Sequence, residues 1–251
     1  MDFDEVFAPV ARIETVRLLL ALAALKGWQV HHMDVKSAFL NGDMLEEVYV
    51  QQPPGFFVKD CSGKVLKLKK ALYGLRQAPR AWNAKLDNEL LKLVFVRNPL
   101  EHVVYRRTGK DGPLLVGVYV DDLVISNSSI ESFKREMMSS FNMSDLGLLS
   151  YYLGIQVHQQ DGRITLCQSS YTLKILEQAG MSGCNPCHVP MENRLKLTKN
   201  DKSPLVDKTK YRSIIGSLRY LFNSRPDIAY AVGIVSRYME EPRGSHWAAV
   251  K

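Results

Sequence analysis

Apolar residues recur at helical or strand spacing through roughly the first two thirds of the chain. Residues 11–26 are rich in strong helix formers, are apolar on most sides and end at Gly27, which predicts a buried helix. Residues 79–93 begin with a proline and place Trp82 and three leucines on one face, which predicts a second helix. The other patterns predict a strand at 28–35, two strands joined by a Pro-Gly loop within 48–70, strands at 102–107 and 114–120, an amphipathic helix at 129–141, and a hairpin within 151–167.

The character of the sequence changes near residue 165. Beyond it, three segments predict helices, SSYTLKILEQAG, TKYRSIIGSLRYLFNS and RPDIAYAVGIVSRYME, and a polar loop covers about 182–209. We therefore expect an α+β fold with two parts, an α/β part at 1–165 and a helical part at 166–251.

The composition fits a folded protein in a reducing compartment. With 46% hydrophobic residues among 251, the chain is large enough to bury a real core. Its longest apolar run, at residues 13–25, contains Glu14 and Arg17 and is too short to span a bilayer, so no membrane partner is expected. The N-terminus lacks the pattern of a signal peptide, and four cysteines in a chain of this length do not indicate a disulfide scaffold.

A basic stretch suggests a polyanionic partner. The formal net charge is +7, and the segment from Lys59 to Lys85 holds eight basic residues against a single acid, Asp60, with Tyr73 and Trp82 between them. Such a stretch can follow a phosphate backbone and offer rings for stacking. A solvated basic face is an equally good interpretation of this feature alone.

Three carboxylates carry the candidate chemistry. Asp34 ends a predicted strand, and Asp121 and Asp122 occupy a turn between two apolar strands. Adjacent acids repel one another unless cations neutralise them, and oxygen ligands are those that Mg²⁺ prefers. Two such ions about 4 Å apart can promote phosphoryl transfer. Aspartate is also a common turn residue, and it is the pattern Tyr119 to Asp122 inside an apolar hairpin that favours a catalytic role.

The motifs resemble those of copia-type retrotransposon polymerases. The residues Tyr119-Val120-Asp121-Asp122 are similar to the catalytic hairpin of reverse transcriptases. The segments FAPVARIETVRLLLALAALKGWQVHHMDVKSAFLNGDMLEEVYVQQPPGF, LKKALYGLRQAPRAW and YRSIIGSLRYLFNSRPDIAYAV occur in the order of that family. The resemblance implies an RNA-directed DNA polymerase with a right-hand palm and partial fingers at 1–165, followed by a helical thumb and the start of a connection at 166–251.

The same resemblance implies roles for individual residues. Asp34, Asp121 and Asp122 match the carboxylates that hold two magnesium ions, for which manganese can substitute. Phe39 falls where the family places the aromatic residue that crowds the sugar 2′ position, although a core phenylalanine would look the same. The implied nucleotide-binding residues are Phe39, Tyr73, Gly74 and Gln77, and the implied template-primer residues are Arg76, Pro79, Arg80, Tyr119, Leu153 and Gly154. Without the family, the segment 73–79 would be a loop-to-helix junction and Leu153-Gly154 an ordinary hairpin turn.

The implied partners are an RNA or DNA template with its primer and deoxynucleoside triphosphates. By resemblance, ribonuclease H and integrase regions are expected on the full polyprotein but outside this chain, and further fingers strands are expected before Met1. A remnant that binds nucleic acid without polymerising, and a two-metal nuclease, are the alternatives. The pair Cys184 and Cys187 has zinc-ligand spacing, but the sequence offers no matching second pair.

Overall fold

The computed structural model describes residues 8–56, 63–109, 112–126 and 130–251, and the chain forms two compact units. The first unit comprises Met1–Leu149 and Gln159–Ile164, and the second comprises Ser150–His158 and Thr165–Lys251. Each unit is described by itself. The three carboxylates and the segment 39–80 lie in the first unit, and the turn Leu153-Gly154 lies in the second.

A six-stranded antiparallel sheet organises the first unit. Its strand order is β4-β5-β6-β7-β1-β8, so the first strand in sequence lies between two later ones. The strands are β1 (Val30–Val35), β4 (Val96–Arg97), β5 (Val104–Gly109), β6 (Gly112–Tyr119), β7 (Asp122–Ser126) and β8 (Met143–Leu148).

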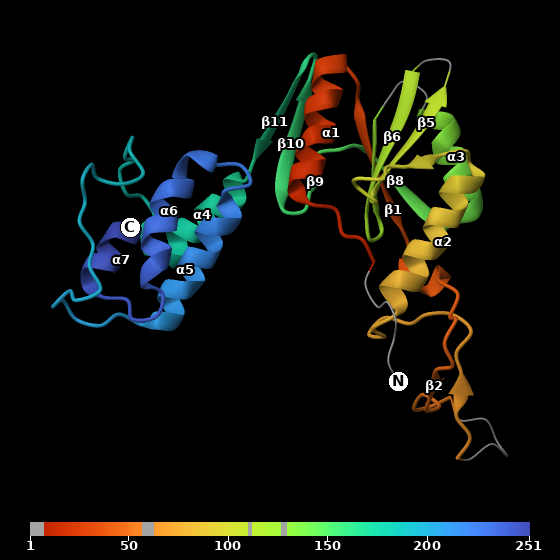
Figure 1. Ribbon diagram of the computed structural model, residues 1–251, viewed down its shortest axis with the longest axis horizontal. Helices are drawn as coiled ribbons and strands as arrows, with labels where there is room; N and C mark the ends of the chain where they lie inside the picture. The colour runs from red at the N-terminus through yellow and green to blue at the C-terminus, as the bar shows by residue number, and fades with distance from the viewer. Residues whose placement is uncertain (1–7, 57–62, 110–111, 127–129) are drawn as a thin grey trace. The chain divides into compact units, whose positions relative to one another are not determined.

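Helices cover both faces of this sheet (Figure 1). The helices α2 (Ala78–Lys92) and α3 (Ile130–Ser140) pack on one face, where Trp82, Leu86 and Leu90 join the main core. The helix α1 (Ile13–Lys26) lies on the opposite face and ends where Gly27 takes the left-handed conformation, with φ of 65°. Side chains alternate along each strand, so Met33 and Val35 of β1 face α2, and the residues between them face the other way.

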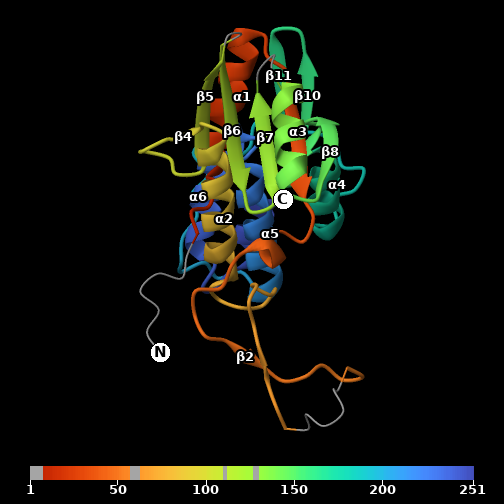
Figure 2. The same cartoon turned by 90° about the vertical axis from the view of Figure 1, so that its right-hand side faces the viewer.

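Between β1 and α2, the chain forms an arm that projects from the sheet (Figure 2). It begins at the 3₁₀ turn η1 (Ala38–Asn41) and contains a small ribbon of β2 (Tyr49–Val50) and β3 (Leu66–Lys67). These two strands are much shorter than the pattern at 48–70 predicts. After η1, glycine at position 42 has a packing reason, because a Cβ on Gly42 would lie 2.7 Å from the backbone nitrogen of Trp82.

The second unit is mainly helical. Its helices are α4 (Ser169–Gln178), α5 (Lys208–Leu221), α6 (Ala229–Val235) and α7 (Gly244–Val250), with 3₁₀ turns η2 (Pro226–Ile228) and η3 (Ser236–Tyr238). Tyr211 of α5 is fully buried, and its hydroxyl donates to the carbonyl of Val235, 2.8 Å away. Outside the six-stranded sheet, β9 (Tyr151–Tyr152), β10 (Ile155–Gln160) and β11 (Arg163–Cys167) form a three-stranded sheet in the order β11-β10-β9, of which Gln159–Ile164 belong to the first unit.

The predicted elements are largely confirmed, and four are new. The helices at 11–26, 79–93 and 129–141 and the hairpin at 114–126 are present with end shifts of a few residues. Strands β4, β8 and β9 and helix α7 were not predicted from the pattern, and all are short or lie at a sheet edge. Among the described residues, no helix combines the length and the apolarity needed to cross a membrane.

Candidate active site

The acidic turn is the two-residue connection between β6 and β7. Tyr119 pairs with Asp122 across the hairpin, so Val120 and Asp121 form the turn itself. Val120 has φ of 56°, in the left-handed region that a β-branched residue rarely adopts. The turn is therefore tight, and it presents Asp121 at the end of the sheet.

The register of the sheet brings Asp34 to this turn. Asp34 of β1 lies directly opposite Asp122 of β7, and directly opposed residues on one face have Cβ atoms about 4.5–5.5 Å apart. The amide of Val35 donates to the carbonyl of Asp121, with 2.9 Å between nitrogen and oxygen. Residues far apart in the sequence, Asp34 and the pair Asp121-Asp122, thus meet at one end of two paired strands.

Burial and neighbouring charge act on Asp121. Burial raises the pKa of its carboxyl above the ordinary value, its own backbone amide partly offsets that effect, and the charges of Asp122 and Asp34 raise the pKa further. Both effects disfavour the ionised form. A cation at this position would relieve them.

Two basic side chains hold the other carboxylates. Lys36 Nζ lies 2.9 Å from Asp34 Oδ2, and His32 Nε2 lies 2.6 Å from Asp122 Oδ1. Neither partner is among the residues predicted from the sequence. The signal was present, because residues two positions from Asp34 on a strand share its face.

The carboxylates fit divalent cations in donor type and in strand register. In the ranges that the structure describes, however, no group of three or more His, Cys, Asp or Glu side chains is arranged to hold a metal ion. Asp34 and Asp122 instead face Lys36 and His32. Their side chains are 25% and 27% exposed, which leaves them room to rotate.

An apolar cavity of about 700 Å³ lies beside the turn, on the α2 face. It is lined by Phe39, Arg76 and Pro79, three of the predicted site residues, together with Trp82, Val118 and Val120 among others. Its volume is within the range of small-molecule sites. Three residues predicted to bind nucleotide or template thus line a cavity that Val120 of the acidic turn also lines.

The predicted aromatic residues contact each other. The ring centroids of Phe39 and Tyr73 are 4.7 Å apart and tilted by 37°. Gly74 follows with φ of 95°, and no atom lies within 4 Å of the place where its Cβ would be. The backbone there is open on one side, as the close approach of a ligand requires.

Comparison with known proteins decides the family. A family model described as "Reverse transcriptase (RNA-dependent DNA polymerase)" matches residues 1–193. The chain belongs to this reverse transcriptase family.

The relatives are polyproteins of retrotransposons. The chain is 38% identical over its whole length to the Retrovirus-related Pol polyprotein from transposon TNT 1-94 of Nicotiana tabacum, and covers 20% of that protein. It is 37% identical over its whole length to the Pol polyprotein from transposon RE2 of Arabidopsis thaliana, and covers 17% of it. A transposon Ty5-1 protein of Saccharomyces cerevisiae is 39% identical over 85% of this chain, which covers 71% of that protein. The resemblance to copia-type elements is confirmed, and the chain spans a fifth or less of the polyproteins.

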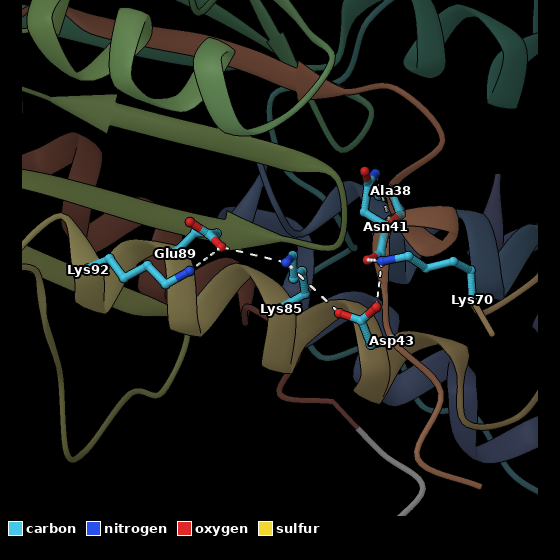
Figure 3. Close-up of polar contacts among 7 residues, drawn as sticks. All are labelled: Ala38, Asn41, Asp43, Lys70, Lys85, Glu89 and Lys92. Atoms are coloured by element: carbon cyan, nitrogen blue, oxygen red, sulfur yellow. Dashed lines mark hydrogen bonds and ion pairs between the residues drawn. The ribbon is translucent and has the colours of Figure 1, made fainter.

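Acids from outside the basic stretch pair with four of its described residues, Lys67, Lys70, Arg80 and Lys85. Figure 3 shows Asp43 between Lys70 and Lys85, and Glu89 between Lys85 and Lys92. Lys67 pairs with Glu47, and the predicted template residue Arg80 pairs with Glu46. Within the described part of the stretch, no ion pair engages Lys64, Lys69 or Arg76, while Lys59 and Asp60 lie outside the described residues. Acids at 43–47 thus offset part of the basic charge, and the role of the stretch on a phosphate backbone stays a prediction.

The remaining predicted residues are placed as follows. Gln77 is buried, and its carbonyl accepts from the amide of Ala81 at the start of α2. Tyr119 is half-buried and packs against the cluster of Ala11, Val103 and Val104, on the α1 face of the sheet. Asp34 and Asp122 alternate with core residues of β1 and β7, so they share that face with Tyr119.

The turn Leu153-Gly154 lies in the second unit and is held there by α5. Both residues have positive φ, 48° and 76°, and the hydroxyl of Tyr220 donates to the carbonyl of Leu153. A Cβ on Gly154 would press on the hydroxyl end of Tyr220, so that side chain would have to shift, and the positive φ also favours glycine. The hairpin is thus a packed feature of this unit.

The cysteines form no metal site among the described residues. Cys184 and Cys187 are exposed free thiols in the loop before α5, and Cys167 is a half-buried free thiol. Cys61 lies outside the described residues.

Proposed function

We propose that this chain is the polymerase core of a copia-type reverse transcriptase, an RNA-directed DNA polymerase. The reaction is attack of a primer 3′-hydroxyl on the α-phosphate of a deoxynucleoside triphosphate, with release of pyrophosphate. The observation that carries the proposal is the register that sets Asp34 opposite Asp122 beside Asp121, in a chain of this family. In this proposal residues 1–165 act as the palm with partial fingers, and residues 166–251 act as the thumb and the start of the connection.

Asp34, Asp121 and Asp122 would hold two magnesium ions, or manganese in their place. Bound there, the ions would neutralise the carboxylates, activate the attacking hydroxyl and stabilise the leaving oxygen. To bind them, Asp34 must turn from Lys36 and Asp122 from His32, which their exposure allows.

Other residues of the chain would position the substrates. The Phe39 ring, packed on Tyr73, would stand against the sugar 2′ position and exclude a ribose hydroxyl by steric contact. Gly74 would let the backbone approach the nascent base pair, near Gln77. Arg76 and Pro79 line the cavity that would face the template, and Leu153-Gly154 would support the primer end.

Primer extension tests the proposal. The chain is incubated with an RNA template, a labelled DNA primer, deoxynucleoside triphosphates and Mg²⁺, and compared with Asp121→Asn and with Asp161→Asn, which removes a charge at an exposed turn elsewhere. We expect extension by the wild type and by Asp161→Asn, and a loss of about 100-fold or more in Asp121→Asn. Equal extension by all three would refute the assignment of the carboxylates.

A second candidate function is nucleic-acid binding without polymerisation. It is favoured by the pairing of Asp34 with Lys36 and of Asp122 with His32. Among the described residues, these carboxylates are not arranged together as metal ligands. The same assay separates the two. Salt-sensitive binding of template-primer without extension, in the wild type, would favour the binding protein, and shortened rather than lengthened products would indicate a nuclease.

A further inference from the structure

The side chain of Trp82 contacts the acidic turn from α2. Its indole is 2% exposed, and Nε1–H donates to the carbonyl of Val120, with 2.6 Å between nitrogen and oxygen. The ring is fixed by edge-to-face packing on Phe141, at 5.1 Å and 77° between planes. A buried indole N–H needs such an acceptor, and this acceptor is the carbonyl immediately before Asp121.

Val120 is a residue that requires support. A β-branched residue rarely adopts a φ of 56°, and such a conformation persists only where the surroundings determine it. Packing on the α2 face does not supply all of that support, because Val118, Val120 and Trp82 line the 700 Å³ cavity. The hydrogen bond from Trp82 of α2 to the carbonyl of Val120 adds a directional contact to this packing.

The turn is held from its other side as well. The amide of Val35, next to Asp34, donates to the carbonyl of Asp121 at 2.9 Å. Consecutive carbonyls of the turn therefore accept from two different elements, α2 and β1. Loss of either bond would free the turn to relax toward a conformation that valine prefers, and Asp121 would move with it.

We propose that Trp82 is a positioning residue, whose indole N–H fixes the left-handed Val120 turn and thereby the place of Asp121 relative to Asp34. The same bond sets the distance between that turn and the start of α2, which carries Pro79 and Arg80. The kinetic consequence rests on the proposed polymerase function. The structural consequence, a fixed turn, does not.

The test combines Trp82→Phe with Val120→Asn. Phenylalanine keeps an aromatic ring but removes the donor, and asparagine tolerates the left-handed region at nearly the size of valine. We expect Trp82→Phe to lower kcat for primer extension by about 10- to 100-fold with little change in KM for the nucleotide. We expect Val120→Asn to restore most of kcat in the Trp82→Phe background. A purely structural role of the indole would not be rescued, because the missing ring volume remains missing.

Amide hydrogen exchange supplies a readout that needs no activity. The amide of Val35 should exchange faster in Trp82→Phe and regain protection in the double variant. The amide of Leu149, which donates to Val30 at the other end of β1, should be unchanged throughout. If wild-type chain extends no primer but this exchange pattern holds, the polymerase proposal fails and the role of Trp82 in fixing the turn stands.

Two outcomes would overturn the inference. One is Val35 protection in Trp82→Phe equal to that in the wild type, and the other is a kcat loss that Val120→Asn does not reverse. Should Trp82→Phe fail to fold, 3-benzothienylalanine at position 82 removes only the donor, because sulfur replaces the N–H in a ring of the same shape. The same exchange and kinetic criteria then apply.

Discussion

Replacement of Gly42 by alanine tests the packing that carries the arm onto α2. Gly42 follows η1, and a Cβ there would lie 2.7 Å from the backbone nitrogen of Trp82 and 2.8 Å from the carbonyl carbon of Ala81. Both are backbone atoms within a helix, so neither can move aside alone. Since φ of Gly42 is −68°, the cost arises from this contact and not from backbone strain.

The expected cost is that of overpacking a core contact, about 1–3 kcal/mol in the free energy of unfolding. For a chain of this size, this corresponds to a fall in Tm of about 2–12 °C. Urea unfolding followed by circular dichroism measures the change, with the slope m expected to stay constant. The amide of Ala71, which donates to the carbonyl of Gly42 at 3.0 Å, should exchange faster because η1 must shift.

Gly109→Ala is the matched control within the same unit. The nearest atom to a Cβ on Gly109 is the carbonyl oxygen of Gly112, at 3.5 Å, which is an ordinary contact. We expect its free energy of unfolding to change by about 0.5 kcal/mol or less. If Gly42→Ala unfolded at the same urea concentration as this control, with Ala71 still protected, the close approach of the arm to α2 would be wrong.

Two further predictions concern a helical glycine and a buried lysine. Gly216 is exposed within α5 with open space around it, so Gly216→Ala should raise the free energy of unfolding by about 0.5–1 kcal/mol in the same assay. Lys134 is 5% exposed and pairs with Asp145 at 2.8 Å and Glu131 at 3.1 Å, so Lys134→Met should cost about 1–2 kcal/mol, discounted because Asp145 keeps solvent contact. Partial burial acts to raise the pKa of Asp145, but the hydrogen bonds from Lys134 and from the backbone amide of Gly147 hold that pKa below its ordinary value. Because the pKa of Asp145 is lower in the folded state, its ionised carboxylate stabilises the fold at pH values above its unfolded pKa of about 3.9. That stabilisation is lost as the pH falls through the folded pKa. Unfolding at pH 7, 4 and 3 should therefore show a smaller acid loss in Lys134→Met, and an equal loss would contradict the pairing.

The elements that the sequence predicts well are those with strong local signals. Proline in its first turn and Trp82 with its leucine repeats define α2, and Gly27 ends α1 where a left-handed residue is needed. The hairpin around Asp121 has two long apolar strands. By contrast, β4 and β9 are two residues long, and such short edge strands exist only because a neighbour supplies hydrogen-bond partners.

The contacts that the sequence could not predict join distant segments. Asp43 and Glu46 neutralise basic residues that follow them by 27 to 42 positions, a pairing that depends on how the arm folds back. The bond from Trp82 to Val120 is of the same kind, since a helical pattern explains why Trp82 is buried but not which carbonyl it meets. The ion-pair partners of Asp34 and Asp122 could be predicted only in part from the sequence. Strand alternation puts Lys36 and His32 on the face of Asp34, and the register of β1 against β7 brings Asp122 within reach of His32.

That register follows from burial. Met33 of β1 lies opposite Leu123 of β7, and both side chains are fully buried beneath α2 and α3. A slip of one residue would turn Met33 toward the other face and drive Asp34 into the core, because side chains alternate along a strand. The free energy of burying an uncompensated carboxylate forbids that pairing. The apolar residues of β1 and β7, which carry no chemistry of their own, therefore set Asp34 against Asp122, and the conformation of Val120 then decides where Asp121 lies beside them.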